Sequence, residues 1–391
     1  MTMMANLNSK LGLFRLGTRW LSSTGSGPGK RVAAVWGNGD YGRLGLGSLD
    51  SQWSPTPLLC SAFQDQSLEA VACGGAHTLF LTQAGRVFAT GLNDFGQLGA
   101  STDVPYATEP VEVSGINKPV VQISAGYYHS CAVTVLLAED GELYMWGKNS
   151  YGQLGLGKRG AKTVPAPAKV ECLAGITIRM VALGSEHSVA VTDGGESLSW
   201  GGGSGRLGHG PESGILGIFK STGSKKLLLD CCIQHALTGS LKGKNGTAPS
   251  MISRLPCSEE VSCGGYHTCV ITSGGELYSW GSNENGCLGI GTTDVLHLPE
   301  RVQGPFLKSA VIKVSCGWKH TAAISEGNIF TWGWGGSHGT FSEEGHSSGG
   351  QLGQGTDVDY IKPMRVKFGE NLKALQISCG FNHTGAILEY T

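Results

Sequence analysis

Hydrophobic residues along this chain fall in short runs where apolar and polar positions alternate, and glycine-centred turns separate the runs. Residues 267–280 illustrate the pattern, because two alternating runs flank the pair Gly274 and Gly275. A period of two on either side of a glycine turn is typical of a β-hairpin. The pattern therefore predicts an all-β chain of short antiparallel strands.

Two signatures recur along the chain and mark its repeating unit. The first is an opening Gly, preceded by Trp in five of six copies and followed by Gly-x-Leu-Gly, and the opening glycines stand at positions 37, 91, 147, 201, 281 and 333. Their spacings are 54, 56, 54, 80 and 52 residues. The second signature is Gly-x-x-His-Ser/Thr, with its histidine at His77, His129, His187, His267, His320 and His383. Six copies of both signatures indicate a repeat protein whose unit holds four short strands.

These repeats resemble the regulator of chromosome condensation family of β-propellers, and the chain is most similar to the plant mitochondrial members of that family. The resemblance implies a seven-bladed type of propeller over residues 32–391, with six clear repeats. The 80-residue interval exceeds one repeat by about 26 residues, and residues 211–256 contain neither signature. We therefore expect residues 211–256 to form a degenerate seventh blade.

The two ends of the chain each supply half of one hairpin. Residues 385–391 end partway through the repeat, and residues 31–36 begin at the complementary half. Pairing of these N- and C-terminal strands would hide the edges that an open ring exposes. We expect the propeller to be closed in this way.

Residues 1–31 have the composition of a targeting leader. Residues 1–39 contain no Asp or Glu and carry five basic residues, namely Lys10, Arg15, Arg19, Lys30 and Arg31. Such a segment is typical of a mitochondrial transit peptide, and Arg19 lies three residues before an expected cleavage between Leu21 and Ser22. The alternative is a plain extension before the first strand, with the protein in the nucleus or cytoplasm.

The charge of the remaining chain disfavours a broad grip on nucleic acid. The chain has 29 basic and 30 acidic residues, so 24 basic and 30 acidic residues remain after the leader's five, a net charge of −6. A net acidic body repels a phosphate backbone on average. One stretch is basic: residues 211–256 hold Lys220, Lys225, Lys226, Lys242, Lys244 and Arg254. This stretch either binds RNA or an acidic protein directly, or is an eroded blade without a binding role. No apolar run is long enough for a membrane helix.

The residues that could suggest chemistry are better explained as parts of the repeat. We expect the six repeat histidines to be buried and to bind a neighbouring backbone carbonyl. The slot before the repeat glycine holds Cys, Ala or Leu, which indicates a small apolar core position, and no cysteine pair has zinc-finger spacing. Residues 203–208 spell Gly-x-Gly-x-x-Gly without a following helix pattern. We therefore expect no catalytic residue, no metal site and no cofactor.

Two places are candidates for contact with a partner. Trp318 and Lys319 follow a repeat glycine, and a photoreceptive member of the family carries a Trp-Arg pair there in adjacent blades. The other copies in this chain hold Gly75, Tyr127, Ser185, Gly265 and Phe381, so the sequence predicts a partner contact and no tryptophan cluster. The second place is the insertion at residues 335–349 together with Trp334, which precedes it. Its candidate contact residues are Trp334, His338, Phe341, Glu343 and Glu344.

A non-catalytic protein-interaction scaffold in mitochondria is the expected function. The resemblance to mitochondrial family members implies a role in organelle gene expression, either in transcript processing and splicing or in ribosome function. The alternative is guanine-nucleotide exchange on a small GTPase, which is the activity of the founding member of the family. Exchange needs no covalent chemistry, because the factor binds the nucleotide-free GTPase better than the loaded one.

Overall fold

The chain folds into antiparallel strands and short turns. The computed structural model describes residues 31–63, 66–100, 104–134, 141–157, 161–192, 197–201, 217–219, 256, 258–265, 267–336 and 349–391. The helical elements in these ranges are four single 3-10 turns: η1 (Asp40–Gly42), η2 (Ser61–Phe63), η3 (Glu171–Leu173) and η4 (Gly304–Leu307). None of the helices in these ranges could cross a membrane. The expected all-β fold is confirmed.

The described strands form six four-stranded antiparallel sheets, and each sheet runs from an inner to an outer strand. The first two are β3 (Leu68–Cys73), β4 (His77–Thr82), β5 (Val87–Leu92) and β6 (Tyr106–Glu112), then β7 (Val120–Ala125), β8 (His129–Thr134), β9 (Leu143–Lys148) and β10 (Thr163–Lys169). The next two are β11 (Ile178–Leu183), β12 (His187–Thr192), β13 (Ser197–Gly201) and β14 (Gly217–Phe219), then β15 (Ser258–Cys263), β16 (His267–Thr272), β17 (Leu277–Gly281) and β18 (Leu296–Arg301). The last two are β19 (Val311–Cys316), β20 (His320–Ser325), β21 (Asn328–Gly333) and β22 (Tyr360–Arg365), then β23 (Leu372–Cys379), β24 (His383–Tyr390), β1 (Arg31–Gly37) and β2 (Gln52–Pro57).

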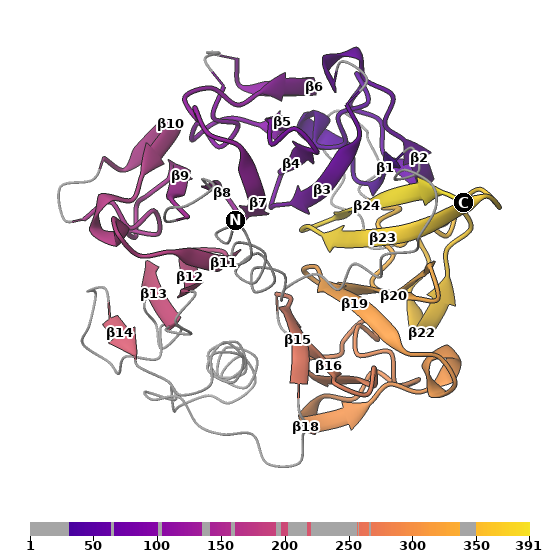
Figure 1. The fold of residues 1–391 in the computed structure, drawn as a ribbon. Coiled ribbons are helices and arrows are strands. Elements are labelled where there is room, and N and C mark those ends of the chain that lie inside the picture. The colour runs from indigo at the N-terminus through magenta and orange to yellow at the C-terminus, as the bar shows by residue number, and fades with distance from the viewer. Residues whose placement is uncertain are drawn as a thin grey trace, which may run out of the picture. The chain divides into compact units, whose positions relative to one another are not determined.

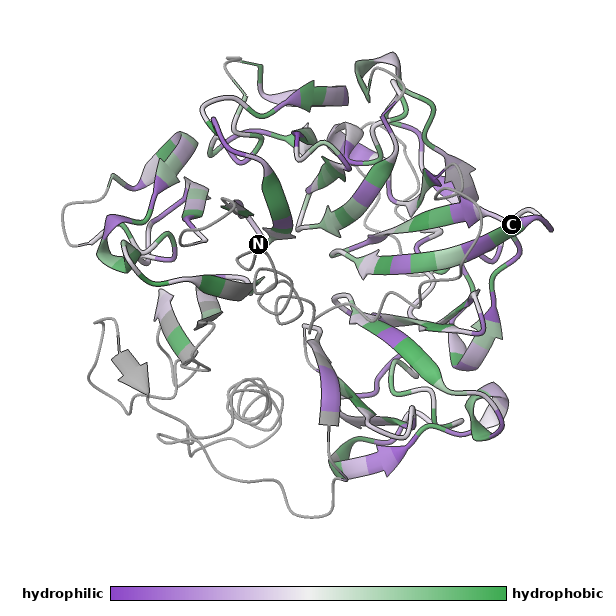
Figure 2. Cartoon of the chain, viewed as in Figure 1, coloured by the Kyte–Doolittle hydropathy of each residue, from purple (hydrophilic) through white to green (hydrophobic). Residues whose placement is uncertain are grey.

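The sheets are the blades of a propeller (Figure 1). The inner strands contact one another in the order β15, β19, β23, β3, β7 and β11. Apolar residues lie on the strands of each blade (Figure 2). The core is built between neighbouring blades, because Leu79 and Leu81 of one blade share a buried cluster with Ile123 and Trp146 of the next. Alternation along each strand supplies an apolar residue to both blade faces.

The N- and C-terminal strands pair in one blade, as the phase of the repeat predicted. β1 runs antiparallel to β24, with Arg31 opposite Glu389 and Gly37 opposite His383. The Arg31 guanidinium, 2% exposed, also forms an ion pair of 2.6 Å with Glu69 in the adjoining blade. β1 is therefore joined to β24 of its own blade by strand pairing and to the adjoining blade by an ion pair.

Three residues within the expected degenerate blade at residues 211–256 are described as a strand. Gly217–Phe219 forms β14 and pairs with β13, Ser197 lying opposite Phe219. This segment is therefore the outer strand of the preceding blade, because a four-stranded blade still needs its fourth strand after residue 201. Except for β14 and Pro256, residues 211–256 lie outside the described residues, and so do the six basic residues of this stretch and the glycines at 203–208.

Candidate functional site

Both sequence signatures lie on the same face of the propeller, which we call the motif face. In an up-and-down sheet, the loop between the first and second strands and the loop between the third and fourth strands lie at the same end. The Gly-x-x-His loop at residues 317–319 joins β19 to β20, and the connection from β21 to β22 begins at Trp334. Where both loops are described, the repeat thus directs two variable loops of a blade toward one surface.

The repeat histidines whose side chains are described join one blade to the next through a hydroxyl group. Nε2 of His77 lies 2.8 Å from Ser130 Oγ, and that hydroxyl donates a hydrogen bond of 2.8 Å to the carbonyl of Gln97. Because the single hydroxyl proton goes to the carbonyl, His77 must donate from Nε2. The same link recurs as His129 to Ser188 at 3.3 Å, His267 to Thr321 at 2.7 Å, His320 to Thr384 at 3.0 Å and His383 to Thr78 at 2.9 Å.

The expectation that each histidine ring binds a backbone carbonyl directly is therefore wrong, because a hydroxyl group lies between the ring and the carbonyl. The ring binds the Ser or Thr of the next copy's own Gly-x-x-His-Ser/Thr signature, and that hydroxyl binds the carbonyl. His187 begins β12, and its side chain lies outside the described residues. Burial lowers the pKa of His77 and of His320 to about 3. These histidines are neutral at pH 7 and tie blades together.

The carbonyl that accepts a hydrogen bond from this hydroxyl also accepts one from the indole N–H of the repeat tryptophan. Trp146 Nε1 donates to the carbonyl of Gln97 at 2.8 Å, so the Gly-x-Leu-Gly connection of one blade is held against the indole of the next. Gly99, which ends this connection, has a φ of +63°, and a Cβ there would lie 2.7 Å from Trp146 Nε1. Glycine is required both for its backbone angle and for this close approach.

A continuous group of aromatic rings lies on the motif face, and we call it the aromatic row: Trp318, Phe381, Tyr127, Tyr128 and Phe95. The ring centroids of Trp318 and Phe381 are 4.6 Å apart, and those of Phe381 and Tyr127 are 5.5 Å apart. Trp318, Phe381 and Tyr127 occupy the same position in their repeats. These separations and tilted rings are typical of favourable aromatic pairs.

Gly75 explains how rings from non-adjacent blades meet. It occupies the position of Phe381 and Tyr127 in the blade between them, and a Cβ there would lie 2.4 Å from the carbonyl oxygen of Tyr127. Phe381 N also donates to the carbonyl of Gly74 at 3.2 Å. With no side chain at residue 75, the two rings contact each other across this blade. The sequence showed that a tryptophan cluster was missing but did not reveal this row of mixed aromatic residues.

Cationic side chains border the aromatic row. Lys148 Nζ lies 5.0 Å from the centroid of Phe95 and 5.1 Å from that of Tyr128, within the range of cation–π attraction. Burial, reinforced by Tyr127, raises the pKa of Tyr128 to about 12, so its hydroxyl stays protonated. Lys319 Nζ lies 3.4 Å from the Glu284 carboxylate, so this cation has an acidic neighbour. The row is therefore aromatic with only a modest positive character.

The candidate contact residues Trp318, Lys319 and Trp334 lie together at one end of this row. Trp334 N donates to the carbonyl of Lys319 at 2.9 Å, which joins the loop after β21 to the loop carrying Trp318. Trp318 and Lys319 also border a small recess whose other lining residues are Ser282, Glu284, Asn285 and Cys287. His338, Phe341, Glu343 and Glu344 lie outside the described residues. Gly350 N donates to the carbonyl of Gly335 at 3.1 Å, so the insertion starts and ends at one point on the motif face.

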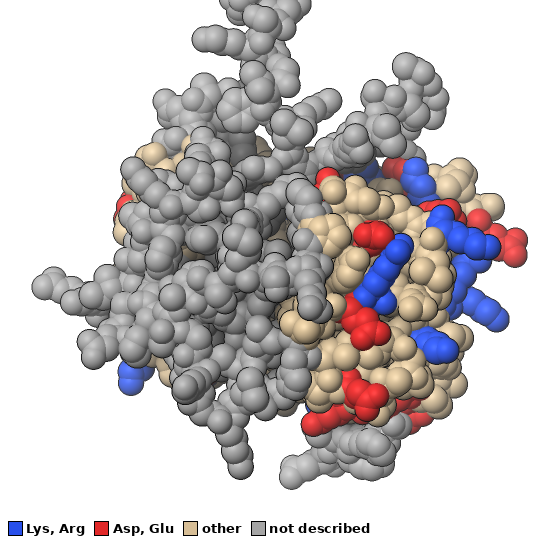
Figure 3. Space-filling model, turned by 90° about the horizontal axis from the view of Figure 1, so that it is seen from below, with Lys and Arg blue, Asp and Glu red and all other residues tan. Residues whose placement is uncertain are grey.

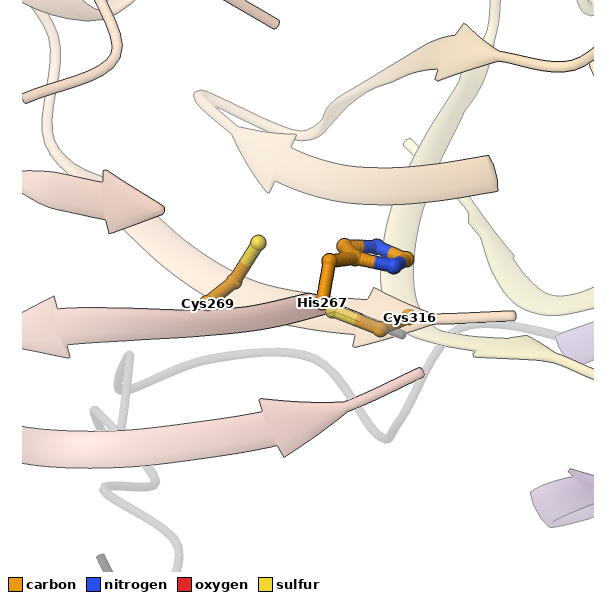
Figure 4. Close-up of side chains that lie close together, drawn as sticks. All are labelled: His267, Cys269 and Cys316. Atoms are coloured by element: carbon orange, nitrogen blue, oxygen red, sulfur yellow. The ribbon is translucent and has the colours of Figure 1, made fainter. Parts of the chain in front are cut away.

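A buried cluster of one imidazole and two thiols lies beneath the recess residue Cys287. His267 and Cys269 come from β16, and Cys316 ends β19 in the next blade (Figure 4). Burial lowers the pKa of His267, but the thiols of Cys287 and Cys316 outweigh it and raise that pKa. Sequence spacing did not find this cluster, because its members belong to different copies of the repeat.

The charges on the outer side of the molecule are mixed. Basic and acidic side chains are interspersed over the described part of the side drawn in Figure 3. Basic and acidic side chains on the blades form ion pairs, such as Lys313 with Glu260 at 2.8 Å and Arg301 with Glu276 at 3.0 Å. The described residues on this side present no single-sign field for steering a charged partner.

Residues 32–387 match the family model of the RCC1-like domain. The sequence is 33% identical over 361 residues to the ultraviolet-B receptor UVR8 of Arabidopsis thaliana, an alignment that covers 92% of this chain and 71% of UVR8. The fold is similar to that of human WBSCR16, with a TM-score of 0.74, 23% identity and coverage of 92% of this chain and 99% of the other. It is also similar to Prp20p of Saccharomyces cerevisiae, a protein with binding properties to Gsp1p and histones, with a TM-score of 0.75, 21% identity and coverage of 93% and 92%.

Proposed function

Because this chain belongs to the RCC1-like domain family, we propose that it is a non-catalytic protein-interaction scaffold of mitochondria that supports organelle gene expression. Transcript processing, including splicing, and ribosome function are the two forms of that role. The observation that carries the proposal is the aromatic row on the motif face, with Trp318 at one end. A rigid disc of blades holds these rings in place for a partner.

The composition of the aromatic row suits a protein partner. Aromatic residues are enriched in the centres of protein interfaces, where a few of them supply most of the binding free energy. The nearby cations are few, since Lys319 is paired with Glu284 and Lys148 lies over Phe95 and Tyr128. A nucleic-acid partner would need more unpaired basic groups to neutralise its phosphates.

The mitochondrial part of the proposal is supported by residues 1–31. Their acid-free, arginine-bearing composition is typical of a transit peptide. A fusion of residues 1–31 to a fluorescent protein is expected to enter mitochondria, and the mature N-terminus is expected near Ser22. Accumulation of the full-length protein in the nucleus would contradict this part of the proposal.

The partner is tested by affinity purification from isolated mitochondria, with and without RNase. The variant Trp318→Ala/Phe381→Ala is expected to lose its co-purifying proteins, because it removes one end of the aromatic row. Tyr390→Ala is the matched control, since Tyr390 is an exposed aromatic residue at the opposite end of β24 from His383. Equal melting temperatures would show that both variants fold. Retention of every partner by the double variant, or loss of all partners on RNase treatment, would overturn the proposal.

Guanine-nucleotide exchange on a small GTPase is the second candidate function. Its support is the fold shared with Prp20p, a protein with binding properties to Gsp1p. A similarity at 21% identity indicates the fold alone, so this candidate depends on a direct measurement of nucleotide release.

A further inference from the structure

The imidazole and the two thiols between the β15–β18 and β19–β22 blades are placed like ligands of a metal ion. His267, Cys269 and Cys316 each offer one ligand atom, and these atoms all lie within 4.8 Å of one another (Figure 4). The three residues are 1%, 0% and 6% exposed. In a tetrahedral zinc site the Zn–S and Zn–N bonds of about 2.3 Å and 2.0 Å place the ligand atoms just under 4 Å apart. Small side-chain movements would close the present arrangement around one ion.

The local structure fixes the positions of these groups. His267 and Cys269 are two residues apart on β16, so both side chains point to the same face of that strand. Cys316 is held at the end of β19 by Ser262 of β15, whose Oγ accepts a hydrogen bond of 2.9 Å from the Cys316 backbone N–H. The Cys316 thiol itself lies 3.4 Å from the Ser262 carbonyl. Two adjacent blades thus present their ligands to one point.

The repeat provides four internal comparisons for this cluster. Each comparison combines the residue two positions after a repeat histidine with the residue before the repeat glycine of the next blade. His77 has Leu79 and Ala125, His129 has Cys131 and Leu183, His320 has Ala322 and Cys379, and His383 has Gly385 and Cys73. Among these and the His267 copy, two thiols come together only beside His267. The combination is a departure from the repeat, and apolar residues at the same two positions are sufficient for the fold.

We propose that His267, Cys269 and Cys316 form a zinc-binding site in the core between these two blades. Thiolate sulfur and imidazole nitrogen are the ligands that Zn²⁺ prefers, and three protein ligands leave a fourth position for a further donor. Cys287 is the adjacent thiol that could supply it: it is 5% exposed and belongs to the Gly-x-Leu-Gly connection packed against Trp332. Its backbone carbonyl accepts the hydroxyl of Thr321, the residue that His267 Nε2 also binds.

The recess on the motif face lies beside Cys287, the fourth candidate ligand. Cys287 lines this recess together with Glu284, Asn285 and Lys319. The recess is the entry path that this proposal requires, with the Cys287 thiol at its wall. A zinc site that is buried still needs such a path.

Zinc binding is tested with Zn²⁺ on the purified full-length protein under reducing conditions. The metal-free protein is titrated in competition with a chromogenic chelator, and one equivalent of zinc is expected to bind. Cys269→Ala and Cys316→Ala are each expected to weaken this binding by at least about 100-fold, because each removes one of three ligands. Zinc at a hundredfold excess over its Kd is expected to raise the Tm of the wild type by about 3 °C and that of neither variant.

Matched controls come from the repeat itself. Cys131→Ala and Cys73→Ala alter the corresponding two positions in other copies and are expected to keep the full equivalent of zinc. All four variants retain Cys231, Cys232 and Cys257, so zinc held by those residues would remain in every variant. Unchanged binding in Cys269→Ala and Cys316→Ala would therefore overturn the proposal.

A measurement on the unaltered protein protects the test against variants that fail to fold. Replacement of zinc by Co²⁺ is expected to give the thiolate-to-cobalt charge-transfer absorption of a Cys-ligated tetrahedral site. Absence of that absorption, or of any bound zinc in the wild type, would overturn the proposal. Neither measurement depends on the partner of the aromatic row, so the zinc site and the proposed function can fail separately.

Discussion

At the residue scale, the link from histidine to hydroxyl to carbonyl shows why the repeat needs Ser or Thr after its histidine. The His77 ring, Ser130 and the Gln97 carbonyl are all buried and come from two blades. A buried polar group without its partner costs more than the bond itself contributes. The hydroxyl is therefore specified by the blade before it, and Ser and Thr serve equally in the copies that hold Ser130, Thr321 or Thr384.

Ser130→Ala is expected to lower the free energy of unfolding by about 1–3 kcal/mol, because it leaves the Nε2–H of His77 buried without an acceptor. Urea denaturation followed by intrinsic fluorescence measures the change. Ser130→Thr is the control, and it is expected to stay within about 0.5 kcal/mol of the wild type because Thr occupies this place in other copies. An alanine variant as stable as the wild type would show that the link contributes nothing.

At the scale of the element, β1 joins the two ends of the described propeller in one blade. It lies between β24 and β2, and its residue Ala34 is opposite Ala386 on one side and Pro57 on the other. Without β1 the middle strand β24 would expose its edge, and the ion pairs from Arg31 to Glu389 and Glu69 would be lost. A short N-terminal segment thus stabilises a blade in which β23 and β24 lie more than 300 residues away in the sequence.

Ala34→Pro is expected to destabilise the propeller by about 3 kcal/mol or more, since proline cannot take part in the ladder of a central strand. The measurement is the melting temperature together with trypsin resistance. Ala34→Ser keeps the backbone N–H and is expected to lose much less stability. Equal melting temperatures for the proline variant and the wild type would mean that β1 is not needed for closure.

At the scale of the whole molecule, the buried histidines make stability depend on pH. Burial lowers the folded-state pKa of His77, His320 and His383 below the usual value of about 6.5 in the unfolded chain. The unfolded state therefore binds more protons, so this stability is present above pH 6.5 and is lost as the pH falls toward 3. The carboxylate of Glu142, whose pKa its ion pairs with Lys118 and Lys169 lower to about 2, acts in the separate window below pH 4.5.

Between pH 6.5 and 4.5, stability is expected to fall by up to about 1.4 kcal/mol per pH unit for each of these histidines. Urea midpoints at a series of pH values measure the slope. His77→Gln is expected to reduce the slope by one histidine's share, whatever its effect on stability at pH 7. A midpoint independent of pH over this window would contradict the buried, neutral state of the histidines.

Guanine-nucleotide exchange, the second candidate function, is an activity of the whole propeller and is tested on the purified protein. We expect the purified protein not to accelerate nucleotide release from the nuclear transport GTPase, because residues 1–31 indicate mitochondria. Release of a fluorescent nucleotide is the measurement. A catalytic amount giving a hundredfold faster release, about 2.7 kcal/mol of barrier, would contradict the scaffold and favour the exchange factor.

The sequence by itself determined the strands, the repeat and the pairing of the N- and C-terminal strands. Each of these follows from spacing along the chain: the alternation in residues 267–280, the regular opening glycines, and the half-hairpins at the two ends. Strand formation and repeat phase are local or periodic, so they are visible without knowing which residues meet in space. β14 carries no signature, so the sequence did not assign it to the blade of β13.

Only the tertiary structure decided which residues meet across the blades. The acceptor of each histidine, the row from Trp318 to Phe95 and the cluster of His267, Cys269 and Cys316 all join different copies of the repeat. The row also depends on a side chain that is absent, since Gly75 lets Phe381 and Tyr127 touch. Such contacts arise because the propeller places successive blades side by side. The spacing of residues within one repeat does not show which residues of different blades meet.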